Sequence, residues 1–176
     1  MNVTFHRNNM LAASIAAVLL VGATVSAESR AAGSANADIT VSASVADNCT
    51  ITSTPVVFGT FDTLTGDPLN GSGTVTVACT NGASAAVSLD EGQNKAGGSS
   101  ASSPLRQMLF NNGADHFLSY NLYTTSARNI VWGSTGVAAT ADGTAHDIDV
   151  FGKVDGSQQS AIKGDYSDTV NALVSF

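Results

Sequence analysis

The chain has 176 residues, of which 43% are hydrophobic and only 12% are charged, and its formal net charge is −7 at pH 7. This length suits one domain with a substantial core. The negative charge disfavours nucleic acid and anionic lipid as partners, because both are themselves negatively charged.

Residues 1–27 have the three parts of a secretion signal. His6 and Arg7 form a basic start, an uncharged apolar run extends from Met10 to Val25, and Val25-Ser26-Ala27 offers the small residues of a cleavage site. The run is shorter than the roughly 20 residues of a membrane-spanning helix. We therefore predict export, cleavage after Ala27, and no stable membrane insertion of the remaining 176 − 27 = 149 residues.

Cys49 and Cys79 are the only two cysteines, and both lie in the part predicted to be exported. An oxidising compartment would join them, so we predict one disulfide. Closing a loop of about 30 residues stabilises a fold by roughly 3 to 4 kcal/mol on the chain-entropy model. Their spacing matches no zinc or redox motif, which argues against a metal or catalytic role.

The segment after the cleavage site changes character at Asp38. Residues 28–37 show no periodicity and predict a flexible leader, whereas residues 38–45 alternate apolar and polar side chains. The apolar face consists of Ile39, Val41, Ala43 and Val45. This pattern predicts a β-strand.

Short apolar runs separated by Gly, Asn and Asp clusters fill the rest of the chain. The predicted strands are Thr74 to Thr80, Ala83 to Leu89, Arg106 to Phe110, Phe117 to Tyr123, Asn129 to Trp132, His146 to Val154 and Tyr166 to Phe176. No segment keeps a helical period, Asn111 to Asp115 predicts a hairpin turn, and residues 63–73 and 91–103 read as irregular loops. An all-β antiparallel sandwich is expected.

The last predicted strand alternates up to the final residue. Val170, Ala172, Val174 and Phe176 form its apolar face, and the sequence stops inside this strand. An ordinary sandwich would continue through one more turn and strand, so we expect a neighbouring strand to be missing.

Several motifs in this order resemble the spore coat protein U domain family, which includes the major subunits of Csu-type, or archaic, chaperone-usher pili. They are Asp47-Asn48-Cys49-Thr50-Ile51, Phe58-Gly59-Thr60-Phe61, Val75-Thr76-Val77-Ala78-Cys79, Leu118-Ser119-Tyr120-Asn121-Leu122-Tyr123 and Gly164-Asp165-Tyr166-Ser167-Asp168-Thr169-Val170. The resemblance covers nearly the whole chain after the signal.

The resemblance implies an immunoglobulin-like domain over residues 38–176 that lacks its last strand. Residues 38–45 of the next subunit would complete it by donor-strand exchange, joining identical or homologous subunits head to tail into a surface fibre, or pilus, for adhesion or biofilm formation. A periplasmic chaperone would hold the C-terminal strand before an outer-membrane usher assembles the fibre. Ala43 departs from the pattern, since a larger aliphatic would fill a deeper pocket.

Two other functions in the binding class stay open at this point. The family name also covers a spore coat component, so a self-contained secreted coat or binding domain is an alternative. Tyr120, Tyr123 and Trp132 could also line a sugar-binding face of a tip adhesin, although strand aromatics more often pack in cores.

The sequence offers little for an enzyme or a metal site. Asp115, His116 and Ser119 lie close in sequence, but neighbours in a strand point to opposite faces and no nucleophile elbow is present. Asp142, Asp147 and Asp149 lack the spacing of a calcium loop. We expect no enzyme and no cofactor.

Overall fold

The computed structural model describes residues 33–112 and 115–176. The predicted signal peptide and residues 28–32 of the leader lie outside this part. The chain divides into two units, of which the first ends at Ser42 and the second runs from Ala43 to Phe176. Residues 33–42 contain neither helix nor strand and are exposed to solvent. Within the described ranges, no helix has the length and apolarity needed to cross a bilayer.

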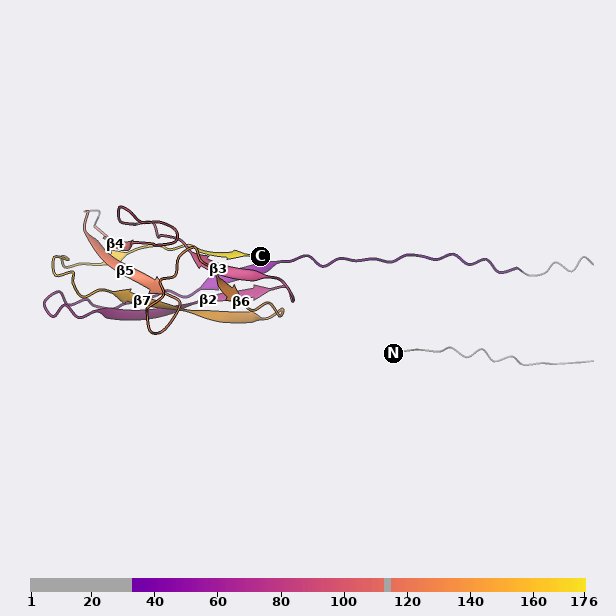
Figure 1. Cartoon of the computed structure of the whole chain (residues 1–176), viewed down its shortest axis with the longest axis horizontal. Coiled ribbons are helices and arrows are strands. Elements are labelled where there is room, and N and C mark those ends of the chain that lie inside the picture. The colour runs from indigo at the N-terminus through magenta and orange to yellow at the C-terminus, as the bar shows by residue number, and fades with distance from the viewer. Residues whose placement is uncertain (1–32, 113–114) are drawn as a thin grey trace, which may run out of the picture. The chain divides into compact units, whose positions relative to one another are not determined.

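The second unit consists of two antiparallel sheets whose strands run side by side in Figure 1. The large sheet has the order β1 (Cys49–Ser53), β2 (Leu69–Cys79), β7 (Ala145–Val154), β5 (Phe117–Tyr123), β4 (Arg106–Phe110) and β8 (Tyr166–Ser167). The small sheet has the order β6 (Val137–Ala139), β3 (Ala85–Leu89) and β9 (Ala172–Ser175). Residues 33–112 and 115–176 contain no helix, so the prediction of an all-β antiparallel fold is confirmed.

Alternating side chains of both sheets form one hydrophobic core. Val77 of β2, Val87 of β3 and Val154 of β7 are completely buried, as expected where every second residue of a strand faces inward. Trp132 is also completely buried and donates its indole N–H to the Val87 carbonyl at 3.1 Å. The core therefore joins the two layers.

Three predicted strands differ from the structure. Residues 38–45 have no strand conformation. Residues 129–132 form a loop, because Trp132 enters the core, and only the single bridge between Tyr123 and Val131 extends the ladder. The predicted strand from Tyr166 to Phe176 is divided into β8 and β9, which belong to different sheets. The hairpin of β4 and β5 was predicted with its correct bounds.

The start of β2 was wrongly predicted as part of a loop. The strand begins at Leu69 and includes Gly71 and Gly73, residues that are unfavourable in strand interiors. A partner ladder stabilises this glycine-rich part, since Leu69 to Ala78 pair continuously with β7. The short strands β1 and β6 were not predicted as strands.

Candidate functional site

An open groove in the second unit lies between residues 51–56 on one side and residues 166–172 on the other. Its volume is about 540 Å³. The remaining lining residues are Phe58, Thr74, Val75, Leu89, Met108, Tyr120, Leu122 and Val150. We call residues 51–56 the first rim and residues 166–172 the second rim.

The floor of the groove is the hydrophobic core itself. Val75, Leu89, Leu122 and Val150 line the groove although each is at most 5% exposed. The first rim begins in β1, which is an edge of the large sheet, and the second rim ends at the start of β9, which is an edge of the small sheet. The floor is therefore apolar, whereas both rims also carry polar side chains. The groove is flanked by two strands that each lack a neighbour on one side among the described strands.

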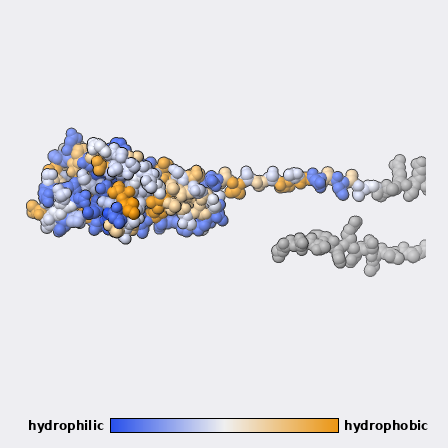
Figure 2. Space-filling view, in the orientation of Figure 1, coloured by the Kyte–Doolittle hydropathy of each residue, from blue (hydrophilic) through white to orange (hydrophobic). Residues whose placement is uncertain are grey.

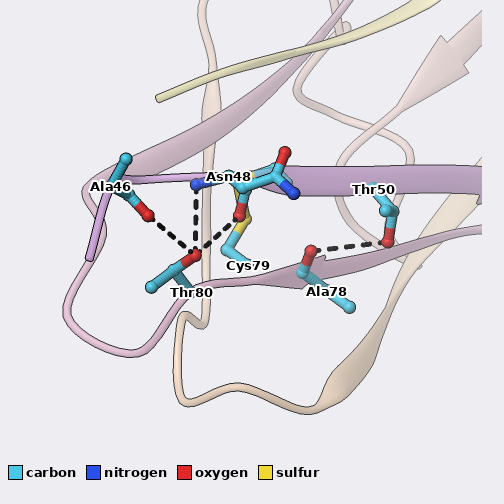
Figure 3. The surroundings of a disulfide bond; sticks show 7 residues. Ala46, Asn48, Thr50, Ala78, Cys79 and Thr80 are labelled. Carbon is cyan, nitrogen blue, oxygen red and sulfur yellow. Dashed lines mark hydrogen bonds between the residues drawn. A yellow bond between two sulfur atoms is a disulfide. The ribbon is translucent and has the colours of Figure 1, made fainter. Parts of the chain in front are cut away.

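The first rim follows a disulfide. Cys49 and Cys79 are directly opposite each other in β1 and β2 and are bonded, with 4.1 Å between their Cα atoms. The prediction of this disulfide agrees with the structure. Thr80 adds hydrogen bonds beside it. Its N–H donates to the Asn48 carbonyl at 2.9 Å. Its hydroxyl accepts from the Asn48 N–H at 3.1 Å (Figure 3). The chain is thus fixed where residues 33–48 lead into β1.

The second rim carries the chain from the large sheet to the small one. Its backbone is paired with the connection that follows β3. Gln93 N–H donates to the Thr169 carbonyl, and Asp90 N–H donates to the Asn171 carbonyl, both at 3.0 Å. Asn171 N–H donates in return to the Asp90 carboxylate at 2.9 Å. These hydrogen bonds, instead of a regular strand ladder, fix the residues that cross from one sheet to the other.

The carboxylate of Asp168 completes this support. One oxygen accepts from the N–H groups of Gln93 and Asn94 at 3.1 and 3.0 Å, and from the Asn94 side-chain amide at 3.1 Å. The other accepts from the Tyr120 hydroxyl at 2.6 Å. Burial, and then this hydrogen bond to Asp168, raise the pKa of Tyr120, so the tyrosine remains a neutral donor at physiological pH.

Arg106 is the buried cation beneath this region. It is 1% exposed, and its guanidinium donates to the carbonyls of Asp90 and Trp132. Burial lowers the pKa of Arg106, whereas the nearby Tyr120, Asp90 and Asp168 oppose that shift. The arginine thus connects β4 to two loops that the core requires.

The residues predicted for the donor strand form an exposed, alternating segment. Ile39, Val41 and Val45 are 87%, 89% and 86% exposed, and Ala43 is also exposed. Figure 2 shows apolar residues of this part of the chain in orange between hydrophilic neighbours. Three of the four apolar positions of this segment are therefore β-branched residues that are almost fully exposed.

The residues predicted for the C-terminal acceptor strand are divided between rim and core. Val170 and Ala172 line the groove, and both pack against the core together with Val174. Phe176 is 54% exposed.

Sequence reasoning missed the polar supports of the groove. The long-range contacts of Asp90, Asp168 and Arg106 could not be inferred from sequence, because they join residues that are 16 to 81 positions apart. Tyr120 was considered as part of a family motif and as a possible sugar-binding aromatic, and its hydrogen bond to Asp168 was not anticipated. Residues 54–56, which continue the first rim, also carried no recognisable pattern.

The alternative sites find little geometric support. Tyr120, Tyr123 and Trp132 are 6%, 8% and 0% exposed, so they do not form a sugar-binding surface. Ser119 accepts from the Gln107 amide at 3.5 Å, and its N–H donates to Gln158.

Two of the three aspartates considered for calcium bond to other protein groups. Asp142 bonds Thr144 and His146, and Asp147 accepts from the Thr76 hydroxyl at 2.6 Å. In the part of the chain that the structure covers, no three His, Cys, Asp or Glu residues are grouped to hold a metal ion.

Comparisons with known proteins identify a family, a similar sequence and a similar fold. The model of the Spore Coat Protein U domain matches residues 35–173. Protein U of Myxococcus xanthus is 33% identical over 180 residues, which cover 96% of this chain and 99% of that protein.

A solved structure is similar in fold. It is a chaperone–tip adhesion subunit pre-assembly complex, CsuC-CsuE, from archaic chaperone-usher Csu pili of Acinetobacter baumannii. The TM-score is 0.52, the sequence identity is 27%, and the aligned region covers 75% of this chain. The chain spans about 40% of the length of the matched chain.

Proposed function

Because the chain belongs to the spore coat protein U domain family, we propose that it is a non-enzymatic structural subunit of a secreted surface fibre of the chaperone-usher type. Residues 38–45 of one copy insert into the groove of the next. This contact uses two different surfaces of each copy, so it does not close on itself and generates a filament.

The observation that carries this proposal is the groove itself. A sandwich whose core residues Val75, Leu89 and Val150 line an open groove is incomplete at that position. An added strand would supply ladder hydrogen bonds to a free sheet edge and apolar side chains to the floor. The groove is bordered by β9, the edge strand of the small sheet.

The exposed segment has the chemistry of such a strand. Burial of Ile39, Val41 and Val45 would stabilise the contact by about 1.5 to 3 kcal/mol each, which is an upper estimate from buried area. Ala43 contributes less. The intervening residues Thr40, Ser42 and Ser44 would face away from the groove.

The similarity to a chaperone–tip adhesion subunit complex supports the proposed partners. We propose that a periplasmic chaperone covers the groove before assembly, that an outer-membrane usher exports the subunit, and that the fibre serves adhesion or biofilm formation. Cleavage after Ala27 would deliver the mature chain to the periplasm.

The test compares two faces of the same segment. Val41→Asp places a charge on the face that enters the groove, whereas Ser42→Asp places the same charge on the opposite face. Unheated material from the cell surface is run on a denaturing gel. The wild type and Ser42→Asp are expected to give a ladder of multimers, and Val41→Asp is expected to give monomer.

A ladder that Val41→Asp leaves unchanged contradicts the proposal. A wild type that is monomeric in sedimentation and keeps its stability without residues 38–45 favours the alternative, a self-contained coat or binding domain.

A further inference from the structure

Three glycines form a patch without side chains on the inner face of the large sheet. Gly71 and Gly73 share the face of β2 that carries the core residue Val75, and Gly152 shares the face of β7 that carries Val150. Gly71 and Gly152 are direct cross-strand partners. We call these three residues the glycine floor. They differ from the floor of the groove, whose lining does not include them.

Residues 54–58 lie directly on the glycine floor. A Cβ atom at Gly71 would be 2.8 Å from the Val57 carbonyl oxygen, and one at Gly73 would be 2.8 Å from the Thr54 carbonyl oxygen. Contacts this short do not occur with real side chains, so the backbone of residues 54–58 would have to move. None of the three glycines has a positive φ. They are therefore required for space and not for backbone conformation.

The third glycine meets side chains instead of backbone. A Cβ atom at Gly152 would be 2.7 Å from the Phe58 ring and 2.7 Å from Val56. The side chains of Val56 and Phe58 thus occupy the space that side chains at positions 71, 73 and 152 would otherwise fill. Arg128 holds the glycine pair together, since its guanidinium donates to the carbonyls of Gly152 at 3.0 Å and Gly71 at 3.4 Å.

Residues 54–58 overlap the end of the first rim and form a wall of the groove. Thr54, Pro55, Val56 and Phe58 line it, and Val56 and Phe58 line a second, adjoining cavity of about 850 Å³ as well. Any displacement of residues 54–58 away from the sheet changes the shape of both spaces.

We propose that the glycine floor determines the shape of the donor-strand groove by letting residues 54–58 lie one side-chain layer closer to the sheet. This inference rests on the proposed function of the groove. The three glycines are positioning residues: they touch the wall of the groove, and the wall touches the inserted strand.

The test uses the full mature chain with Val41→Asp as acceptor, because its own segment is impaired while its groove is unchanged. The probe is a fluorescent synthetic peptide of residues 36–47, and its dissociation constant is measured by anisotropy. Gly71→Ala and Gly73→Ala are expected to weaken peptide binding about tenfold, which corresponds to about 1.4 kcal/mol. Gly97→Ala is the matched control, since a Cβ atom there meets nothing within 4 Å.

A double-mutant cycle separates a change in the groove from a general loss of stability. Gly152→Ala meets only side-chain atoms, so the wall can adjust and the fold survives. It is expected to weaken peptide binding several-fold, and less so when Phe58→Ala has removed the ring that the new methyl group meets. An equal effect in both backgrounds overturns the inference.

The two proposals fail in different ways. If the Val41→Asp acceptor with all its glycines does not bind the peptide, the proposed function is wrong. If that acceptor binds and the Gly71→Ala and Gly73→Ala acceptors bind as tightly as Gly97→Ala, the groove functions and the glycine floor does not shape it.

Discussion

The two rims of the groove are fixed by different chemistry. The first rim continues from a covalent bond between Cys49 and Cys79, in a strand that pairs regularly with β2. The second rim crosses between sheets and depends on hydrogen bonds to Asp90 and Asp168. The first support depends on oxidation, and the second depends on carboxylate acceptors.

The largest effect is expected at the covalent support. Replacing Cys49 and Cys79 together with alanine should lower the free energy of unfolding by about 3 to 4 kcal/mol, because the disulfide closes a loop of about 30 residues in the unfolded chain. Urea denaturation measures the difference. A reducing agent should destabilise the wild type similarly and leave the double variant unchanged. Equal stability of the two proteins would show that the first rim does not depend on the disulfide.

Removing the main acceptor of the second rim should have the next largest effect. Asp168→Ala leaves the half-buried Asn94 N–H without its acceptor, whereas the Gln93 N–H keeps the Thr169 carbonyl. The free energy of unfolding should fall by about 2 to 3 kcal/mol, because the Tyr120 hydroxyl and the Asn94 side-chain amide lose the same carboxylate. Faster hydrogen exchange at the Asn94 amide, with a smaller change at Gln93, checks the cause. Asp168→Asn is the control, since its carbonyl can still accept from both. Unchanged exchange in Asp168→Ala would contradict the role assigned to this carboxylate.

A smaller effect is expected when only one bond to this carboxylate is lost. Tyr120→Phe removes the 2.6 Å hydrogen bond to Asp168 and keeps the ring that packs edge-on against Phe58. The free energy of unfolding should fall by about 1 kcal/mol. In Asp168→Ala, the further change Tyr120→Phe should cost less than in the wild type, because the acceptor is already absent. Additive losses would mean that the pair does not interact.

The local parts of the fold were predictable from sequence, and the supports of the second rim were not. The hairpin of β4 and β5 follows from alternation on both sides of an Asn and Gly turn, and the disulfide follows from two cysteines in a chain predicted to be exported. Both signals lie in the residues themselves. The division of residues 166–176 into two strands depends on Asp168, whose partners are 48 to 75 residues away.

The glycines of β2 show why a correct local rule can mislead. Gly71 and Gly73 lie in a segment that reads as a loop, since glycine weakens strands. They belong to a strand because Leu69 to Ala78 pair continuously with β7, and residues 54–58 occupy the space that side chains at these positions would need. That reason is visible only when two segments of the chain are seen together, and the same is true of the groove that these segments border.

The smallest effect is expected at an exposed carboxylate near the disulfide. Hydrogen bonds from Thr144, and then His146, lower the pKa of Asp142 to about 2, and the Gly143 N–H donates to the Cys79 carbonyl at 3.1 Å. Because the pKa of Asp142 is lower in the folded chain than in the unfolded chain, its ionisation stabilises the fold at pH values above about 3.9. This contribution is lost as the pH falls toward 2.

An NMR titration of the Asp142 carboxyl should therefore give a midpoint near 2. Thr144→Val should move the midpoint upward, because it removes the hydroxyl donor, whereas Thr140→Val should not move it. Because Asp142 is exposed, Asp142→Ala should leave the urea midpoint nearly unchanged, in contrast to Asp168→Ala. If Asp142→Ala and Asp168→Ala lowered the urea midpoint equally, the greater burial of the Asp168 carboxylate would not explain its role in stability.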